Sequence, residues 1–286
     1  MENFLMEVKK PTTYSEQIEK IEARGCIIYD KERCCEILSS VGYYRFSAYF
    51  LPSKKQDGRY EDGTTFEHVY RLYEFDRKLR NILFAIIEDI EIYMRSKLSY
   101  FHAHKYGALG YLNPANFGKK HDGKAFADII SDEIKHNSEV QFVKHHINQY
   151  EGQFPLWVAM ELFTFGMLSK FYGDMKTSDK KELFGVKYES VSSWLRCCTD
   201  LRNICAHYGR LYYRKFTAIP KNLNLDAENE RSLWGVVLTV KELNSSNEKW
   251  NAEVVLKLAA LFEEYRDDID LRHISFPDNW ETILSE

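Results

Sequence analysis

Residues 65–106 read TFEHVYRLYEFDRKLRNILFAIIEDIEIYMRSKLSYFHAHKY, and this stretch decides the fold class. Its apolar residues recur at steps of three and four, which is the period of one face of an α-helix. Thr64 or Thr65 can cap the first turn, and Gly107 follows the last periodic residue. The spacing therefore predicts one unusually long helix. The residues that carry the period are Val69, Leu72, Leu79, Leu83, Ile86, Ile90 and Met94.

The rest of the chain also favours helices, so we predict an all-α fold. Of 286 residues only 14 are Gly and 6 are Pro, which is too few for a sandwich or barrel rich in turns. The turn signals Asp57-Gly58 and Asp62-Gly63 indicate one small hairpin near residues 50–64. Further helices are expected within 14–41 and 125–150, from Phe154-Pro155 to Leu168, over 188–216, and over about 228–245 and 251–268.

Charge and cysteine content restrict the possible functions. The net charge is −4, so any contact with nucleic acid must come from a local basic patch. The first residues show no basic segment followed by an apolar run, and no segment is long and apolar enough for a bilayer. We therefore expect a cytoplasmic protein without membrane contact. None of the six cysteines forms a C-x-x-C pair, so neither a metal site nor a cofactor is expected.

Three segments are predicted along the chain. Residues 1–64 form a helical, aromatic-rich N-terminal segment, and residues 65–218 form the helical core. Residues 226–286 form a C-terminal helical segment packed on that core, and this segment carries 14 acidic residues against 6 basic ones.

The segment 195–216, LRCCTDLRNICAHYGRLYYRKF, is the most informative for function. Placed on a helix, it has an apolar face and an opposite, unbroken polar stripe. Five basic residues lie between Arg196 and Lys215 against the single acid Asp200, so this is the one strongly basic segment of the chain. The stripe consists of Arg196, Asp200, Asn203, His207, Arg210 and Arg214.

Arg202 fits neither face of this helix. Its neighbours one turn away are the small residues Cys198, Cys205 and Ala206, so it is expected at the border of the core. A guanidinium there needs a partner. Glu161 lies in the apolar run that follows Pro155, and we expect it to support Arg202.

Arg202-Asn203-Ile204-Cys205-Ala206-His207 resembles the R-N-x-x-x-H form of the motif of HEPN ribonucleases. From about Lys10 to Trp280 the chain also resembles the Abi-like family of abortive-infection proteins of the AbiD and AbiF type. The matching pieces, in order, are Gly42-Tyr43-Tyr44-Arg45, residues 73–80 (YEFDRKLR), Tyr106-Gly107 with Tyr111-Leu112, Pro155-Leu156-Trp157 leading to Glu161, Phe165-Gly166-Met167-Leu168-Ser169, and Phe276-Pro277-Asp278-Asn279-Trp280.

The resemblance implies a HEPN-like helical bundle with extra helices at both ends, acting as a metal-independent endoribonuclease of phage defence or toxin type. It implies that Arg202 and His207 are catalytic. His207 would move protons near neutral pH, Arg202 would hold the phosphate, and Asn203 would position the 2′-OH or a water. The products would end in 2′,3′-cyclic phosphate and 5′-OH.

The partners expected from the resemblance are RNA and a second copy of the chain. Five helical steps place Arg202 and His207 about 140° apart, which favours a site shared across a homodimer. A regulatory small RNA is a further expected partner, and an antitoxin stays open. The alternative function is a non-catalytic protein that holds a structured small RNA; a helical scaffold that binds only protein is a third.

Four other residues are weaker candidates for RNA contact. Arg210 and Arg214 either bind phosphates or are merely solvated. Arg95 and His102 lie on one face of the long helix together with Glu88 and Glu91. Their simpler interpretation is a solvent-exposed face with a Glu91–Arg95 pair, and the sharper one is that they line the RNA path.

Overall fold

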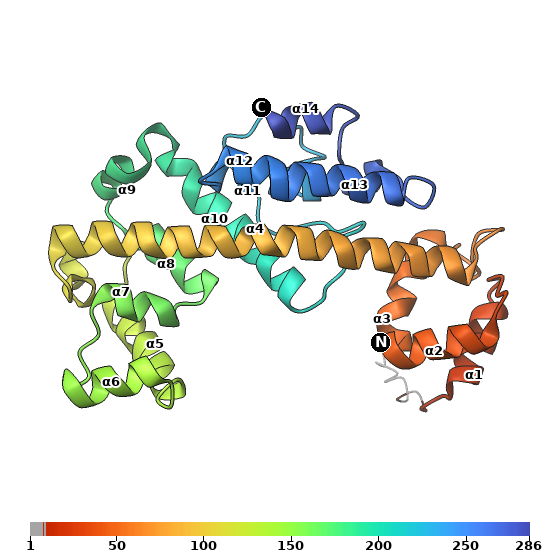
Figure 1. Ribbon diagram of the computed structural model, residues 1–286, viewed down its shortest axis with the longest axis horizontal. Coiled ribbons are helices and arrows are strands. Elements are labelled where there is room, and N and C mark those ends of the chain that lie inside the picture. The colour runs from red at the N-terminus through yellow and green to blue at the C-terminus, as the bar shows by residue number, and fades with distance from the viewer. Residues whose placement is uncertain (1–7, 9) are drawn as a thin grey trace, which may run out of the picture. The chain divides into compact units, whose positions relative to one another are not determined.

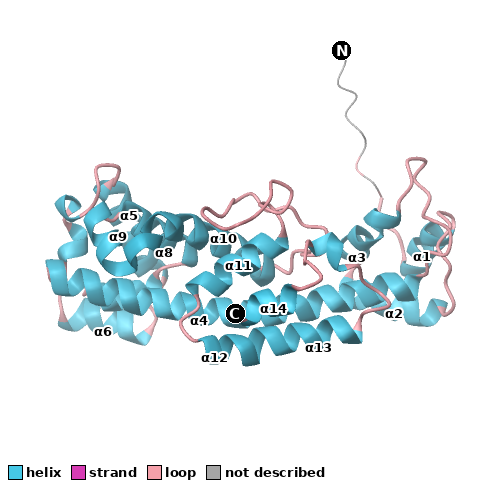
Figure 2. Ribbon diagram, turned by 90° about the horizontal axis from the view of Figure 1, so that it is seen from above, coloured by secondary structure: helices cyan, strands magenta, loops and turns pink. Residues whose placement is uncertain are grey.

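The computed structural model describes residue 8 and residues 10–286, and within them the protein is all-α, as predicted (Figures 1 and 2). Only isolated β-bridges occur in this part of the chain. The α-helices are α1 (Tyr14–Glu22), α2 (Lys31–Val41), α3 (Tyr43–Ser47), α4 (Phe66–Tyr106), α5 (Gly123–His136), α6 (Gln141–Gln149), α7 (Leu156–Ala159), α8 (Phe165–Asp174), α9 (Thr177–Phe184), α10 (Tyr188–Ala206), α11 (Leu233–Leu243), α12 (Asn247–Trp250), α13 (Leu256–Glu264) and α14 (Trp280–Ser285). Short 3₁₀ turns include η1 (Ala48–Ser53), η4 (Met160–Leu162) and η7 (Leu271–Ile274), and η6 (Asn251–Val255) is a π-helical turn.

The long helix predicted from residues 65–106 is present as α4, which runs without a break (Figure 1). Thr65 caps it, because its hydroxyl accepts a hydrogen bond from the backbone N–H of His68 at 3.1 Å. The apolar residues that set the period are buried, and most of them are completely enclosed. No helix of the described residues has both the length and the apolar character that crossing a membrane requires.

The chain divides into two compact units, and α4 contributes to both. Unit 1 comprises the residues up to Lys78 together with Leu261–Ile269, and unit 2 comprises Leu79–Ala260 with Asp270–Glu286. These divisions do not test the boundaries predicted at residues 64 and 218, which stay predictions.

Unit 1 begins with capped helices around an aromatic core. Thr13 and Glu16 form a capping box at the start of α1, and Gly42 ends α2 with a φ of 82°. The hairpin expected near 50–64 is reduced to one antiparallel bridge between Lys54 and Tyr60. The core rings of this unit include Phe46, Phe50, Phe66 and Tyr49, all of them buried.

Unit 2 is built around α10, which packs against α8, α9 and α11. Helix α11 is apolar nearly all round, and almost every one of its residues is buried. It therefore forms part of the core of unit 2 and not an outer layer.

The helix expected from Phe154-Pro155 to Leu168 is broken in the structure. Helix α7 ends at Ala159, the turn η4 follows, and Phe163 is extended with ψ 130°. Thr164 then starts α8 by accepting a hydrogen bond from the N–H of Met167. The expectation was wrong because a Thr cap inside an apolar run competes with continuation of the helix.

The expected helix over residues 188–216 is also too long by one third. Helix α10 ends at Ala206, and Tyr208 has the left-handed φ of 58°. The backbone N–H of Gly209 bonds to the carbonyl of Ile204 at 2.7 Å, and that of Tyr208 bonds to Cys205 at 3.1 Å. These two bonds make a Schellman motif, which ends the helix. The last helical residue of the polar stripe is thus Asn203, and His207 is the C-cap.

Candidate functional site

The R-N-x-x-x-H segment forms the last turns of α10 and its C-cap. Asn203 lies in the final helical turn, and His207 is the capping residue, whose N–H bonds to the Asn203 carbonyl at 3.0 Å. Both side chains are exposed. The Schellman motif turns the chain away directly after His207 and so leaves the end of the helix open to solvent.

Arg202 lies at the border of the core, as its neighbours predict, with 32% of its side chain exposed. Its Nε lies 3.9 Å from a carboxylate oxygen of Glu91 on α4, and its Nη1 donates to the amide oxygen of Asn203 at 3.4 Å. The guanidinium is therefore supported on one side and still reaches solvent.

Glu91 is the residue that the sequence analysis missed as the partner of Arg202. Its side chain is 12% exposed, and its other carboxylate oxygen accepts a hydrogen bond from Arg95 at 2.6 Å. One carboxylate thus faces two guanidinium groups. A carboxylate between them lowers the cost of holding two cations close together, because it offsets their mutual repulsion.

The expectation that Glu161 supports Arg202 is wrong. Glu161 lies in the turn η4, is exposed, and makes no ion pair with the described part of the chain. A single buried helix over residues 154–168 would enclose this side chain. The break at Phe163 and Thr164 removes that helix and with it the reason for burial.

Arg95 is anchored between α4 and the chain at Phe163, with 21% of its side chain exposed. Its Nη2 donates to Glu91 and to the carbonyl of Phe163, both at 2.6 Å. The Glu91–Arg95 pair expected from the i, i+4 spacing is confirmed. The carbonyl it reaches is the one that the break between η4 and α8 frees from helical hydrogen bonding.

His102 is fully enclosed, so neither interpretation drawn from the sequence holds for it. Its ring stacks on Phe117 at 5.1 Å and meets the edge of Phe171 at 5.3 Å. Neither ring nitrogen has a hydrogen-bond partner among the described residues. Burial lowers the pKa of His102 to about 4, so the ring is neutral at physiological pH.

Arg210 and Arg214 follow α10 in the loop 207–232. Arg210 is half-buried near Tyr213, whereas Arg214 is exposed and makes no ion pair with the residues that the structure describes. The loop that carries them is tied down at several points. The carbonyl of Gly209 accepts from Arg80 of α4 at 3.2 Å, and the Tyr212 hydroxyl bonds to Asp270 and His273.

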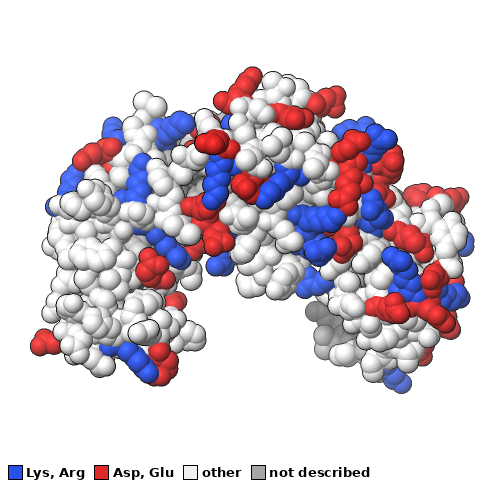
Figure 3. All heavy atoms as spheres, in the orientation of Figure 1, with Lys and Arg blue, Asp and Glu red and all other residues white. Residues whose placement is uncertain are grey.

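A groove of about 510 Å³ runs between α8 and α10, on the helix that carries the motif. Lys170 and Arg196 supply cations to its lining, and Asp174 and Asp200 supply acids. Asp200 is occupied, because it accepts hydrogen bonds from the Thr217 hydroxyl and from the N–H of Ala218. Basic and acidic side chains are interspersed in the same way over the face shown in Figure 3.

Within the described residues, no group of three or more His, Cys, Asp and Glu side chains is arranged to hold a metal ion. The candidate site consists of Arg202, Asn203 and His207 at the end of α10. Glu91 of α4 supports it, because its carboxylate pairs with both Arg202 and Arg95. Arg210 and Arg214 follow in the next loop, and Glu161 and His102 do not belong to it.

Comparison with known protein families identifies a match over most of the chain. A family model described as Abi-like protein matches residues 36–213, which is well over half of the chain and includes the whole of α4 and α10. Neither the curated proteins nor the solved structures contain a significant match.

Proposed function

The chain belongs to the Abi-like protein family, and from this premise we propose that it is an RNA endonuclease of phage defence. The active groups are Arg202 and His207, with Asn203 beside them. The observation that carries the proposal is the state of these side chains at the end of α10. The side chain of His207 is exposed and makes no hydrogen bond or ion pair with the described residues, while the partly exposed Arg202 is paired with the largely enclosed carboxylate of Glu91.

The proposed reaction uses a nucleophile that RNA itself supplies. The 2′-OH attacks the adjacent phosphorus, the bond from phosphorus to the 5′-oxygen of the next nucleotide breaks, and a 2′,3′-cyclic phosphate forms. One proton leaves the 2′-OH and one is delivered to the departing 5′-oxygen. An imidazole suits both transfers, because it gains and loses a proton near neutral pH.

Arg202 supplies a fixed positive charge to the phosphate. Charge on the phosphate oxygens grows in the transition state, and a planar guanidinium can donate two parallel hydrogen bonds to them. The ion pair with Glu91 holds the group through Nε, and Asn203 accepts one hydrogen bond from Nη1. Nη2 and the second N–H of Nη1 are left for the substrate. Asn203 orients the 2′-OH or a water, and Arg210 and Arg214 contact neighbouring phosphates.

Incubation of the purified protein with total RNA in the presence of EDTA tests the reaction. We expect fragments with 2′,3′-cyclic phosphate and 5′-OH ends, and we expect His207→Ala and Arg202→Ala to abolish them. His136→Ala is the matched control, because His136 is an exposed histidine at the end of α5. Cleavage that survives in His207→Ala, or that disappears equally in His136→Ala, contradicts the assignment.

The alternative function has a separate outcome in the same experiment. A non-catalytic holder of a structured small RNA binds RNA with a strong dependence on salt but releases no fragments. Sequencing of the RNA that copurifies with the protein identifies the substrate or the bound RNA. Complete absence of RNA affinity at low salt contradicts both functions.

A further inference from the structure

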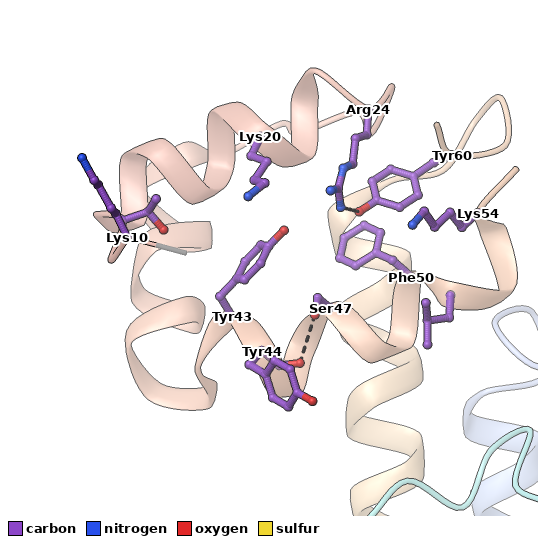
Figure 4. A pocket seen from close by; sticks show the side chains of 11 residues that line it. Lys10, Lys20, Arg24, Tyr43, Tyr44, Ser47, Phe50, Lys54 and Tyr60 are labelled. Carbon is purple, nitrogen blue, oxygen red and sulfur yellow. Dashed lines mark hydrogen bonds between the residues drawn. The ribbon is translucent and has the colours of Figure 1, made fainter. Parts of the chain in front are cut away.

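Unit 1 contains a second, separate candidate site in the form of a pocket of about 370 Å³. It is lined by residues of α1, α3 and the turn η1 and by Tyr60, which forms an isolated β-bridge. In Figure 4, Lys20 and Arg24 point from one side and the ring of Tyr43 points from the other side toward a common space. Nothing in the proposed ribonuclease reaction uses this pocket.

The charge of the lining is entirely positive. Lys10, Lys20, Arg24 and Lys54 line the pocket, and no acidic residue of the described chain does. None of these four makes an ion pair within that part of the chain, whereas nearby Lys31 and Lys55 are paired with Glu22 and with Asp62. Four cations gathered without a counter-charge repel one another, and a bound anion removes that repulsion.

Part of this charge is held in a fixed geometry. Arg24 Nη1 lies 3.5 Å from the hydroxyl of the buried Tyr60, and the same contact raises the pKa of Arg24 above its ordinary value. Tyr60 is itself fixed, because its N–H donates to the Arg24 carbonyl at 2.7 Å. The guanidinium is consequently oriented before any ligand arrives, which lowers the entropy cost of binding.

Aromatic rings supply most of the remaining lining. Phe50 and Tyr60 are buried and form the inner wall of the pocket. Tyr43 and Tyr44 line its mouth, where Tyr44 is 93% exposed. A volume of about 370 Å³ is far larger than a phosphate ion needs and lies at the small end of ordinary ligand pockets. A flat ring can lie on the tyrosines while an attached anion reaches the cations.

We propose that this pocket binds a nucleotide, with its phosphate on Lys20, Arg24 and Lys54 and its base against Tyr43 and Tyr44. The nucleotide is either free or the 5′-phosphorylated terminal residue of an RNA chain, and both carry the same recognised groups. The proposal does not depend on RNA cleavage at α10.

Calorimetric titration with adenosine monophosphate, adenosine and inorganic phosphate tests which groups the pocket recognises. We expect the monophosphate to bind more tightly than either of its parts, because it alone uses both the cations and the rings. If adenosine binds as tightly as adenosine monophosphate, the proposal is wrong. It is also wrong if no probe that carries a phosphate binds, including the 5′-phosphorylated tetranucleotide described below.

Charge-neutralising variants locate the binding. Lys20→Gln/Lys54→Gln removes two lining cations and should weaken binding about tenfold or more, since two charge-assisted hydrogen bonds to the phosphate are lost. The matched control Lys31→Gln/Lys55→Gln removes the same charge from the same unit but outside the pocket. An equal loss in both double variants shows general charge attraction and overturns the site. Tyr44→Ala should weaken the monophosphate and leave inorganic phosphate unchanged.

A 2′-O-methylated tetranucleotide distinguishes the two sources, because it lacks the 2′-OH and cannot be cleaved by the proposed reaction. Tighter binding of its 5′-phosphorylated form than of its 5′-hydroxyl form and of the monophosphate assigns the pocket to an RNA end. Binding of the monophosphate that equals or exceeds that of the 5′-phosphorylated tetranucleotide assigns it to a free nucleotide. If the 5′-hydroxyl and 5′-phosphorylated tetranucleotides bind alike and the monophosphate does not bind, the proposal is wrong.

Discussion

His102 is the residue whose place in the structure differs most from its place in the sequence pattern. On α4 it follows Arg95 by seven positions, and the helical period alone puts the two on one face. The structure encloses the ring between Phe117, Phe171 and Tyr106. These aromatic neighbours come from distant segments, and no local pattern on α4 announces them.

The lowered pKa of His102 predicts a dependence of stability on pH. The folded protein holds the ring neutral down to about pH 4, whereas the unfolded chain takes up the proton near pH 6.5. Above about pH 6.5 the neutral ring of His102 causes no loss of stability. Between pH 6.5 and 4 the free energy of unfolding falls by up to about 1.4 kcal/mol per pH unit.

Chemical unfolding at several pH values measures this contribution. His102→Leu keeps the volume and removes two buried nitrogens without hydrogen-bond partners, so we expect it to be at least as stable near pH 5 and less sensitive to pH. An unchanged pH profile in His102→Leu contradicts the assignment of the slope to this ring.

Glu91 acts on the candidate site through Arg202 and not by touching the substrate. Glu91→Gln keeps its size but leaves Arg95 and Arg202 without their shared counter-charge. We expect RNA cleavage to fall about tenfold or more, with kcat affected more than KM, because the guanidinium of Arg202 is no longer oriented toward the phosphate. Glu88→Gln, an exposed neighbour on α4, is the control and should retain full activity.

The sequence was sufficient to select Arg202, Asn203 and His207 as a candidate site, because they share one short motif on one helix. It was insufficient to find the carboxylate behind Arg202. Both Glu161 and Glu91 were available, and the choice depends on where the chain breaks between α7 and α8. Glu91 lies 111 positions before Arg202, and no helical spacing links residues so far apart.

At the scale of the element, the end of α10 determines the geometry of the motif. The Schellman motif depends on Gly209, since a Cβ there would lie 3.0 Å from the Ile204 side chain and 3.3 Å from its carbonyl oxygen. Gly209→Ala should therefore destabilise the protein by about 1–3 kcal/mol. Urea unfolding measures the change.

Gly173 of α8 provides a control with the opposite sign. A Cβ at this position meets nothing within 4 Å, and the residue is helical. Gly173→Ala should stabilise the protein by about 0.5–1 kcal/mol through helix propensity. Equal effects of the two substitutions contradict the close approach assigned to Gly209.

Elements were predictable where one regular pattern continues for many residues. Helix α4 is predictable because seven apolar positions keep a single period, and Thr65 is one of the two N-cap candidates in the sequence. The break before α8 and the end of α10 were missed for a shared reason. At both positions the apolar period continues in the sequence although the helix does not. Thr164 caps the start of α8, and the left-handed Tyr208 follows the end of α10.

At the scale of the whole molecule, the proposed homodimer has a direct test. If each active site takes Arg202 from one copy and His207 from the other, the variants Arg202→Ala and His207→Ala are inactive alone. Mixed after partial unfolding and refolding, they should recover about a quarter to a half of wild-type activity as heterodimers. Mixtures that stay inactive, or full activity in a monomer isolated by size, contradict a shared site.

The C-terminal segment after Asp226 is part of the core of unit 2. Helix α11 places Trp234, Val237 and Val240 in the core of unit 2, and Cys198 of α10 lies 4.0 Å from Thr239. A chain shortened at Asp226 should therefore be insoluble or unfolded, which circular dichroism and thermal melting reveal. A truncated protein that melts cooperatively at the wild-type temperature contradicts this packing.

The fastening of the loop after His207 has a thermodynamic consequence. Arg80, Asp270 and His273 hold it at Gly209 and Tyr212, so its conformational entropy is already lost when the protein folds. A ligand arriving at the end of α10 meets a preformed surface and has no segment to order. Its association should show the small heat-capacity change of rigid docking and not the large negative change of folding coupled to binding.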